Sequence, residues 1–314
     1  MITALVLAVL VVIALALGRA TWIVTGWADV AATPGHAHDD AGAVTAAGDD
    51  DAPDAGPARG APALIRRGGR PAVVLVHGIL GFDAVGVGPV RVEYFRRVAA
   101  RLDAVGFDVI TARLPPLGPV PARAAALAAR IAALPHDRVR LIAHSMGGLD
   151  ARWALTDPAI AARVDELVTI GTPHHGTPIA DLLTRGAPDL ARAVVGKLGL
   201  PSPAVEWLTT ARLASFNRDV RDAPGVRYAS IVTATADRGR VHPLLWLPHA
   251  YLARVAGPSD GLVPAASQRW GALRAETERD HWAQVGWSGG HDAAELLLTA
   301  LGHGATALPA ASTG

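Results

Sequence analysis

Three residues that lie far apart in the chain have the types needed for nucleophilic acyl transfer: Ser145, Asp260 and His281. In such a site the histidine takes the proton of the serine hydroxyl, and the carboxylate fixes the tautomer of the histidine and stabilises its protonated form. Their order along the chain is nucleophile, acid, histidine, which differs from the orders of the two main classes of serine protease. We therefore predict that Ser145 is the nucleophile, Asp260 the acid and His281 the base.

The surroundings of Ser145 predict how this serine is presented. In the stretch from Val139 to Gly148, apolar β-branched residues run into the serine and a helical pattern follows it. This pattern predicts a strand, a sharp turn and a helix, with Ser145 at the turn. Such a turn strains the serine backbone, so the residues two positions away must be small, as Ala143 and Gly147 are. A turn serine that only caps a helix is the alternative reading of this motif alone.

A glycine-containing loop, His77 to Gly81, follows the short apolar run Ala72 to Val76. In folds with this kind of serine turn, the corresponding loop supplies a backbone N–H group to the negatively charged oxygen of the reaction intermediate. The N–H group of Ile79 is therefore predicted to be one donor. His77 itself is expected to brace the loop.

Other residues compete for the roles of acid and base. Asp237 is an alternative acid, because it follows a strand-like run, whereas the Ser-Asp-Gly sequence around Asp260 is also typical of a plain turn. His291 is an alternative base, but it precedes a helical pattern and suits the start of that helix. The adjacent His174 and His175 have no carboxylate at ligand spacing beside them, so we expect structural roles for both.

The elements that must position these residues alternate between strand and helix. Strand-like runs cover Ala72 to Val76, Asp108 to Ala112, Val139 to Ala143, Val164 to Ile170 and Val226 to Thr233. Helical spacing covers Val92 to Val105, Pro121 to Leu134 and Ala293 to Leu301. Strands separated by helices predict an α/β fold, with a mostly parallel sheet covered by helices on both faces and catalytic residues at the carboxyl ends of the strands.

Residues 178–207 have the pattern of a helical lid. Leu190, Val194 and Leu198 recur at i, i+4 and i+8 and are predicted to line the substrate site. The segment also contains glycines suited to hinges, and it lies beside the predicted mouth of the site. An ordinary helix packed on the domain is the alternative.

The two ends of the chain differ from this domain. Residues 1–28 are apolar enough to cross a bilayer, and Trp22 and Trp27 would suit its interface. We predict an uncleaved anchor, with a cleaved signal sequence as the alternative, so that the protein is exported and either membrane-anchored, facing the periplasm or the outside, or secreted. A disordered Ala/Gly/Asp/Pro linker is expected at 29–65 and a flexible tail at 304–314, leaving 66–303 as the catalytic domain.

Composition excludes several classes of protein. The chain has 314 residues, 51% of them hydrophobic, and a formal charge of +1, which fits one large domain with attached segments. Its arginines are scattered without a basic stripe, so no nucleic-acid partner is expected. The chain contains no cysteine, which excludes disulfides, thiolate metal sites and a cysteine nucleophile.

The chain resembles the bacterial true lipases, typified by the secreted triacylglycerol lipases of Pseudomonas and Burkholderia, over most of residues 71–301. The resemblance rests on Val76 to Gly81, Ala143 to Gly148, Ile170 to Gly176, Leu208 to Arg212, Ser215 to Asn217 and Asp260 to Val263. It implies an α/β-hydrolase fold with Ser145, Asp260 and His281 in the roles given above. It also implies that Met146 supplies a second N–H group beside that of Ile79 to the oxyanion.

The function that this resemblance implies is that of a serine carboxylic-ester hydrolase, a lipase or esterase that cleaves lipid-like acyl esters through an acyl-enzyme. It needs no cofactor, and its partners would be the lipid substrate, the membrane and a folding chaperone. An acyltransferase on the same scaffold and a non-catalytic membrane-anchored binding module are the alternatives. Lipases of this family hold a structural calcium partly through an aspartate two residues after the histidine. Ala283 occupies that position here, so no metal is predicted.

Overall fold

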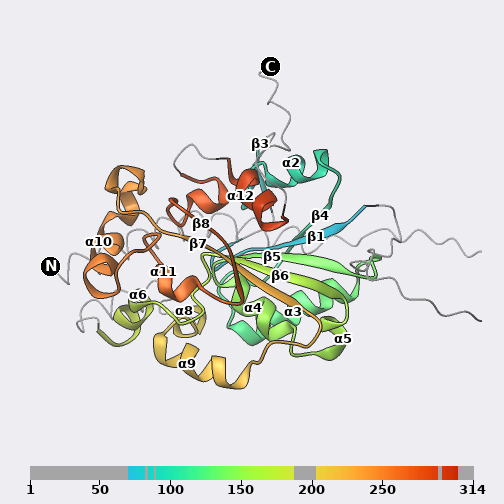
Figure 1. Cartoon of the computed structure of the whole chain (residues 1–314), viewed down its shortest axis with the longest axis horizontal. Helices are drawn as coiled ribbons and strands as arrows, with labels where there is room; N and C mark the ends of the chain where they lie inside the picture. The colour runs from blue at the N-terminus through green and yellow to red at the C-terminus, as the bar shows by residue number, and fades with distance from the viewer. Residues whose placement is uncertain (1–69, 82–83, 88–89, 187–202, 289–291, 303–314) are drawn as a thin grey trace, which may run out of the picture.

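The computed structural model describes residues 70–81, 84–87, 90–186, 203–288 and 292–302, and a six-stranded sheet lies at its centre (Figure 1). The strand order is β4-β1-β5-β6-β7-β8, and every neighbouring pair is parallel. The strands are β1 (Ala72–Val76), β4 (Asp108–Ala112), β5 (Val139–His144), β6 (Val164–Ile170), β7 (Arg227–Thr233) and β8 (Ala272–Thr277). A separate antiparallel pair is formed by β2 (Ala84–Val87) and β3 (Val90–Glu93).

The central strands consist of almost continuous apolar residues because helices cover both faces of the sheet. In β1 every residue is buried. Successive side chains of a strand point to opposite faces. Val74 and Val76 accordingly belong to the apolar cluster on one face, whereas Val73 and Leu75 belong to the cluster on the other.

Two layers of helices complete the core (Figure 1). One face of the sheet is covered by α3 (Val120–Ala132), α4 (Gly147–Ala154) and α5 (Pro158–Ala161), and the other by α2 (Val98–Ala104) and α12 (Ala293–Ala300). Further helical elements lie in the connections that follow β6, β7 and β8. They are α6 (Pro178–Asp181), the π-helix η1 (Leu182–Gly186), α8 (Pro203–Glu206), α9 (Thr210–Asp219), the 3-10 turns η2 (Arg238–Arg240), η3 (Pro243–Leu245) and η4 (Ala283–Val285), α10 (Trp246–Val255) and α11 (Ala265–Gln268).

The predicted α/β class is confirmed, with a parallel sheet between helices. All five predicted strands are present, and their ends differ from the prediction by at most one residue. The helices predicted at Pro121 to Leu134 and Ala293 to Leu301 correspond to α3 and α12. These segments could be read from sequence because each buries one regular apolar pattern.

The helix predicted from Val92 to Val105 is wrong in its first half. Val92 lies in β3, and the helix begins only at Val98, after Arg97 adopts a left-handed backbone conformation with φ 58°. Phe95, Val98 and Leu102 are all buried, as their spacing implied. The spacing identified the residues that face the core, but Phe95 reaches the core from a turn.

Strand β8 and the β2–β3 pair were not predicted. Half of the β8 residues are exposed, because β8 lies at the edge of the sheet. Its sequence, Ala-Leu-Arg-Ala-Glu-Thr, therefore lacks the alternation that burial of one face would impose. Pairing with β7 alone decides that this segment is a strand.

Several predicted segments lie outside the described residues. These are the anchor (1–28), the linker (29–65), the tail (304–314) and the middle of the lid, including Leu190, Val194 and Leu198. The described flanks of the lid segment form α6, η1 and α8. Within the described ranges, no helix is both long and apolar enough to span a bilayer.

Replacing Gly147 with alanine should destabilise the protein by at least about 2 kcal/mol. A Cβ atom at Gly147 would lie 2.6 Å from Val76 O and 2.8 Å from His77 O, both of them backbone atoms at the end of β1. Helix α4 and β1 would have to separate, and the serine turn between β5 and α4 would shift with them. Urea unfolding of the purified protein measures the change.

Gly239→Ala is the control, because its Cβ would meet only the exposed Asp237 side chain, at 3.1 Å. Its unfolding free energy should stay close to the wild-type value. Equal stability of Gly147→Ala and wild type would show that the packing between α4 and β1 tolerates a methyl group.

Candidate active site

Ser145 lies at the turn between β5 and α4 with φ 55°, a left-handed conformation that residues other than glycine rarely adopt. Two contacts hold the turn in this conformation. Ser145 N donates to Ile170 O of β6 at 2.9 Å, and Thr172 Oγ1 donates to Ser145 O at 2.7 Å. The predicted strand, turn and helix are therefore present, and the strained backbone presents the serine side chain at the carboxyl end of the sheet.

The structure brings Ser145, His281 and Asp260 together in a line of hydrogen bonds. His281 Nε2 lies 3.1 Å from Ser145 Oγ, and His281 Nδ1 lies 2.8 Å from Asp260 Oδ2. With the Nδ1 proton donated to Asp260, Nε2 is free to accept the proton of the serine hydroxyl. Asp260 is fully buried, whereas Ser145 and His281 are 6% and 5% exposed. This geometry is suited to deprotonation of the Ser145 hydroxyl by His281.

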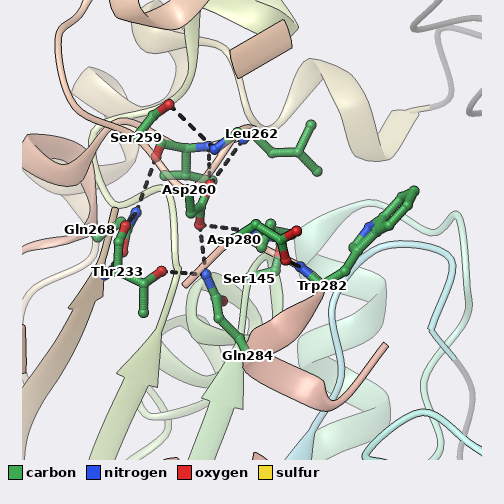
Figure 2. Close-up of polar contacts among 12 residues, drawn as sticks. Ser145, Thr233, Ser259, Asp260, Leu262, Gln268, Asp280, Trp282 and Gln284 are labelled. Atoms are coloured by element: carbon green, nitrogen blue, oxygen red, sulfur yellow. Dashed lines mark hydrogen bonds and ion pairs between the residues drawn. The ribbon is translucent and has the colours of Figure 1, made fainter. Parts of the chain in front are cut away.

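The Asp260 carboxylate is held on both of its oxygens (Figure 2). Oδ1 accepts from Leu262 N at 2.9 Å and from Val263 N at 2.7 Å, within the turn that follows. Oδ2 accepts from His281 Nδ1 and, at 2.8 Å, from Gln284 Nε2. Buried donors of this kind stabilise the ionised form of a carboxylate.

A second histidine packs beside the first. The ring of His144 lies 4.7 Å from that of His281, centroid to centroid. Tyr94 Oη donates to His144 Nδ1 at 2.7 Å, and His144 Nε2 donates to the backbone oxygen of His281 at 3.2 Å. Burial lowers the pKa of His144 well below its usual value, and the neighbouring His281 adds to this effect. A neutral His144 can therefore support the His281 backbone without placing a second positive charge beside the His281 ring.

The loop His77 to Gly81 lies directly against Ser145. A Cβ atom on Gly78 would lie 2.8 Å from Ser145 Cβ, so this position requires glycine. The Gly78 carbonyl accepts from His77 Nδ1 at 2.9 Å. In a trans peptide the N–H group points away from the carbonyl, so these contacts fix the direction of the Ile79 N–H. Within the described residues, neither Ile79 N nor Met146 N donates a hydrogen bond, which leaves both available to a ligand.

A buried ion pair braces the same loop from below. Arg123 Nε and Asp150 Oδ2 are 2.8 Å apart, and both side chains are fully buried. Arg123 Nη2 also donates to His77 O at 2.7 Å and to Gly78 O at 3.2 Å. Burial raises the pKa of the Asp150 carboxyl to about 7, against the opposing effect of Arg123. Arg123 lies in α3 and Asp150 in α4, so the two hydrogen bonds of Arg123 connect the loop to both helices. Breaking the ion pair would leave an unpaired buried charge, which is strongly destabilising.

The competing acid does not approach the histidine. Asp237 caps η2, where its carboxylate accepts from Gly239 N at 2.8 Å, and its side chain is 62% exposed. The competing base, His291, lies outside the described residues. His77 has the bracing role that we expected, since its Nε2 accepts from Leu114 N at 3.2 Å in addition to the Nδ1 contact.

The pair His174 and His175 has structural contacts. His174 is buried and stacks on Trp270, with its Nε2 at 3.0 Å from Thr169 Oγ1. Arg152 approaches its other nitrogen at 3.4 Å. Burial lowers the pKa of His174 well below its usual value, and the positive charge of Arg152 acts in the same direction.

The carboxylate of Asp280 holds the loop that carries His281 by accepting hydrogen bonds from N–H and O–H groups. Asp280 Oδ2 accepts from His242 N at 2.7 Å, and Oδ1 accepts from Ala283 N at 2.7 Å, from Trp282 N at 3.0 Å and from the hydroxyl of Ser288. Both oxygens are thus occupied, and Ala283 offers no ligand. The residues present do not fit the structural calcium implied by the family resemblance.

Sequence reasoning missed several residues of the site: Tyr94, Arg123, His144, Asp150, Asp280 and Gln284. His144 lies within the serine-turn motif, and Asp280 and Gln284 lie next to His281 in the chain, but the sequence does not show what their side chains contact. Tyr94, Arg123 and Asp150 belong to no short motif. The one available signal was charge in an apolar context, as for Arg123 within an alanine-rich helical pattern. Such a residue is rarely buried without a partner, although its partner cannot be read from sequence.

This sheet, with a strained serine after β5, an acid after β7 and a histidine after β8, defines the α/β-hydrolase fold. The chain has the fold of the α/β-hydrolases. A family model described as the PGAP1-like alpha/beta domain matches residues 130–184, which include the serine turn.

Several relatives of this chain are named as triacylglycerol lipases. The chain is 31% identical to "Triacylglycerol lipase 2" of Saccharomyces cerevisiae over 210 residues, which cover 63% of each chain. It is 32% identical to a triacylglycerol lipase of Burkholderia plantarii over 178 residues, which cover 48% of each chain. The chain therefore spans between about half and two thirds of the length of these relatives. The resemblance to triacylglycerol lipases, including bacterial ones, is confirmed.

Solved structures show the same fold. A mature lipase from Bacillus licheniformis superposes with a TM-score of 0.58 at 25% identity, covering 72% of this chain and 91% of that chain. A metagenomic carboxyl esterase superposes with a TM-score of 0.63 at 22% identity, covering 77% of each chain.

Removal of calcium should leave the protein unchanged. Because Asp280 holds the His281 loop through N–H and O–H donors, excess EDTA is expected to alter neither the melting temperature nor any esterase activity of the purified chain. Thermal unfolding and initial rates, with and without EDTA, measure both. A large loss restored by calcium, and not by magnesium, would mean that oxygen ligands outside this loop bind the ion.

Proposed function

We propose that the protein is a serine carboxylic-ester hydrolase that acts on lipid-like acyl esters. The single observation that carries the proposal is the line from Ser145 Oγ to His281 Nε2, at 3.1 Å, and from His281 Nδ1 to Asp260 Oδ2, at 2.8 Å. The lipase relatives support the same reaction class. They do not favour an acyltransferase or a non-catalytic binding module.

In the proposed reaction Ser145 Oγ attacks the ester carbonyl carbon while His281 Nε2 takes the hydroxyl proton. Asp260 stabilises the resulting imidazolium, and the N–H groups of Ile79 and Met146 stabilise the oxyanion, each donor contributing about 3 kcal/mol. His281 then gives its proton to the departing alcohol, and the acyl group remains on Ser145. Water, deprotonated by His281, attacks the acyl-enzyme, and the acid leaves as Ser145 regains its proton.

The apolar surroundings of the oxyanion loop support an apolar acyl group. The half-buried side chain of Ile79 packs against two clusters of buried hydrophobic residues. One consists of Ile179, Ala180, Leu183, Val205 and Leu252. The other consists of Val120, Met146, Leu149, Ala204, Leu213, Phe216 and Val220. Burial of apolar surface against these side chains would favour an alkyl chain over a polar group.

The full chain should hydrolyse p-nitrophenyl esters, and Ser145→Ala should lower kcat by roughly a millionfold without unfolding the protein, because it removes the nucleophile. Initial rates with acetyl to palmitoyl esters measure activity and acyl preference, and circular dichroism checks the fold. An inactive wild type on all of these esters would refute the proposal. Substantial turnover by a folded Ser145→Ala variant would assign the nucleophile to another residue.

Two aspartate variants provide a matched control for the acid. Asp260→Asn should lower kcat by roughly 10⁴-fold, since the amide favours the wrong tautomer of His281. Asp237→Asn changes an exposed carboxylate that caps η2 and should leave kcat within about twofold of wild type. The reverse ranking would identify Asp237 as the acid.

We also propose that residues 1–28 carry the protein out of the cytoplasm and hold it on a membrane, on the basis of their apolar sequence. The full chain expressed in bacteria should sediment with membranes and be digested by protease added to spheroplasts. A variant lacking residues 1–28 should be cytoplasmic and protected. Protection of the full chain would contradict the proposed export.

That a folding chaperone assists this protein stays a prediction. Full recovery of activity after refolding without any chaperone would contradict it.

A further inference from the structure

We propose that Gln284 is a positioning residue of this active site, which acts through the Asp260 carboxylate and adjusts the basicity of His281. The inference rests on the proposed function. Gln284 lies in η4, three residues after His281, and is fully buried. Its amide nitrogen donates at 2.8 Å to Asp260 Oδ2, the same oxygen that accepts from His281 Nδ1.

The second hydrogen bond of the amide fixes its direction. Gln284 Nε2 also donates to the hydroxyl of Thr233, at the end of β7 (Figure 2). Both protons of the amide nitrogen are therefore used, one on the acid and one on the sheet. The amide carbonyl, Gln284 Oε1, has no partner that meets ordinary hydrogen-bond geometry within the described residues, and the hydrogen-bond interaction of the Gln284 side chain with His144 raises the pKa of His144 against the larger effect of burial. The donor side of the amide is thus the side that contacts the acid and the end of β7.

The neighbouring backbone makes room for this side chain. A Cβ atom on Gly171 would lie 2.2 Å from Gln284 Oε1, and Gly171 has φ 59°. Gly171, which directly follows β6, therefore leaves the space that the amide occupies. Gln284 is confined between Gly171 on one side and Asp260 on the other, and such confinement limits rotation of the carboxylate.

The physical consequence concerns the charge on the shared oxygen. Two donors divide the negative charge of Asp260 Oδ2 between them, so each interaction is weaker than it would be alone. Without the Gln284 donor, the oxygen would attract the His281 proton more strongly, and the protonated ring would persist to higher pH. The carboxylate would also lose the contact that fixes its rotation, which slows proton transfer.

Other charged or titratable groups near His281 do not replace this donor. The ring of His144 packs against His281, directs its nitrogens to Tyr94 Oη and to the His281 backbone oxygen, and also interacts with the Gln284 side chain. The Asp280 carboxylate is fully engaged by the donors of its own loop and by His242 N. Gln284 is thus the side chain, among the described residues, that shares an Asp260 oxygen with His281.

Gln268 offers a matched control, because it is also a fully buried glutamine that hydrogen-bonds to Thr233 (Figure 2). Its oxygen accepts from Thr233 N at 2.8 Å, and its nitrogen donates to Thr233 O at 2.8 Å and to Val263 O at 3.1 Å. These partners are all backbone atoms. A variant of Gln268 therefore tests loss of a buried amide without loss of a hydrogen bond to the acid.

The experiment compares Gln284→Ala, Gln284→Met and Gln268→Ala in the full chain. Three readouts are the pH profile of kcat/KM, the split between kcat and KM, and an NMR titration of the His281 ring, which needs no turnover. Both Gln284 variants should lower kcat roughly tenfold with KM within about twofold, and should raise the acid limb and the His281 midpoint by about 0.5 to 1 pH unit. Gln268→Ala should lower the melting temperature without moving the acid limb or the midpoint.

An active wild type whose Gln284 variants keep the wild-type midpoint and kcat would overturn this inference and leave the proposed function standing. Equal shifts in Gln268→Ala would also overturn it, since the effect would then belong to any buried amide at this place. If both Gln284 variants fail to fold, the role of Gln284 is to stabilise the fold, and the proposed positioning role is wrong. An inactive wild type would instead refute the proposed function.

Discussion

The site depends on one constraint, which is the very close approach of three backbone segments around Ser145. The turn of β5 into α4 lies against the end of β1, and the loop after β1 lies across the serine. Gly147 and Gly78 occupy the two points where a single Cβ atom would collide with backbone or with the nucleophile. Because the segments touch through backbone, the direction of the serine side chain and of the Ile79 N–H follows from sheet geometry.

Buried polar groups then hold the loops at fixed positions relative to this centre. Asp260 and Asp280 each accept hydrogen bonds on one oxygen from backbone N–H groups of their own turns and on the other oxygen from another segment of the chain. Arg123 ties the carbonyls of the oxyanion loop to two helices below the sheet. A buried charge is destabilising unless hydrogen-bond donors or acceptors satisfy it. Each of these charged groups therefore restricts the conformation of the loop that it contacts. Preorganisation of this kind is what catalysis through an oxyanion requires.

The strain at Ser145 is supported by the most regular part of the molecule. Its backbone N–H bonds to β6, and its backbone oxygen accepts from Thr172 in the loop after β6. Strands β1 and β6, which flank β5, are buried on both faces. Their close packing opposes the backbone movement by which Ser145 could leave its strained conformation. The loops around β7 and β8, in contrast, depend on side-chain hydrogen bonds for their shape.

The sequence by itself determined the fold class and most of the central strands, and it singled out Ser145, Asp260 and His281, which the structure brings within hydrogen-bond distance. Continuous apolar runs reveal strands that are buried on both faces, and small residues around Ser145 reveal the turn, because both are local requirements of the backbone. Chain order favoured Asp260 over Asp237, although sequence gave no distance to support the choice.

Only the tertiary structure decided which side chains surround these three residues. The edge strand β8 carries no apolar alternation, and Phe95 reaches the core from a turn, so neither element could be read from periodicity. The partners Tyr94 with His144, Arg123 with Asp150 and Gln284 with Asp260 are separated by 24 to 50 positions in the chain. A single sequence carries no signal for such pairs, because hydrogen bonds between distant residues depend on how the strands are ordered in the sheet.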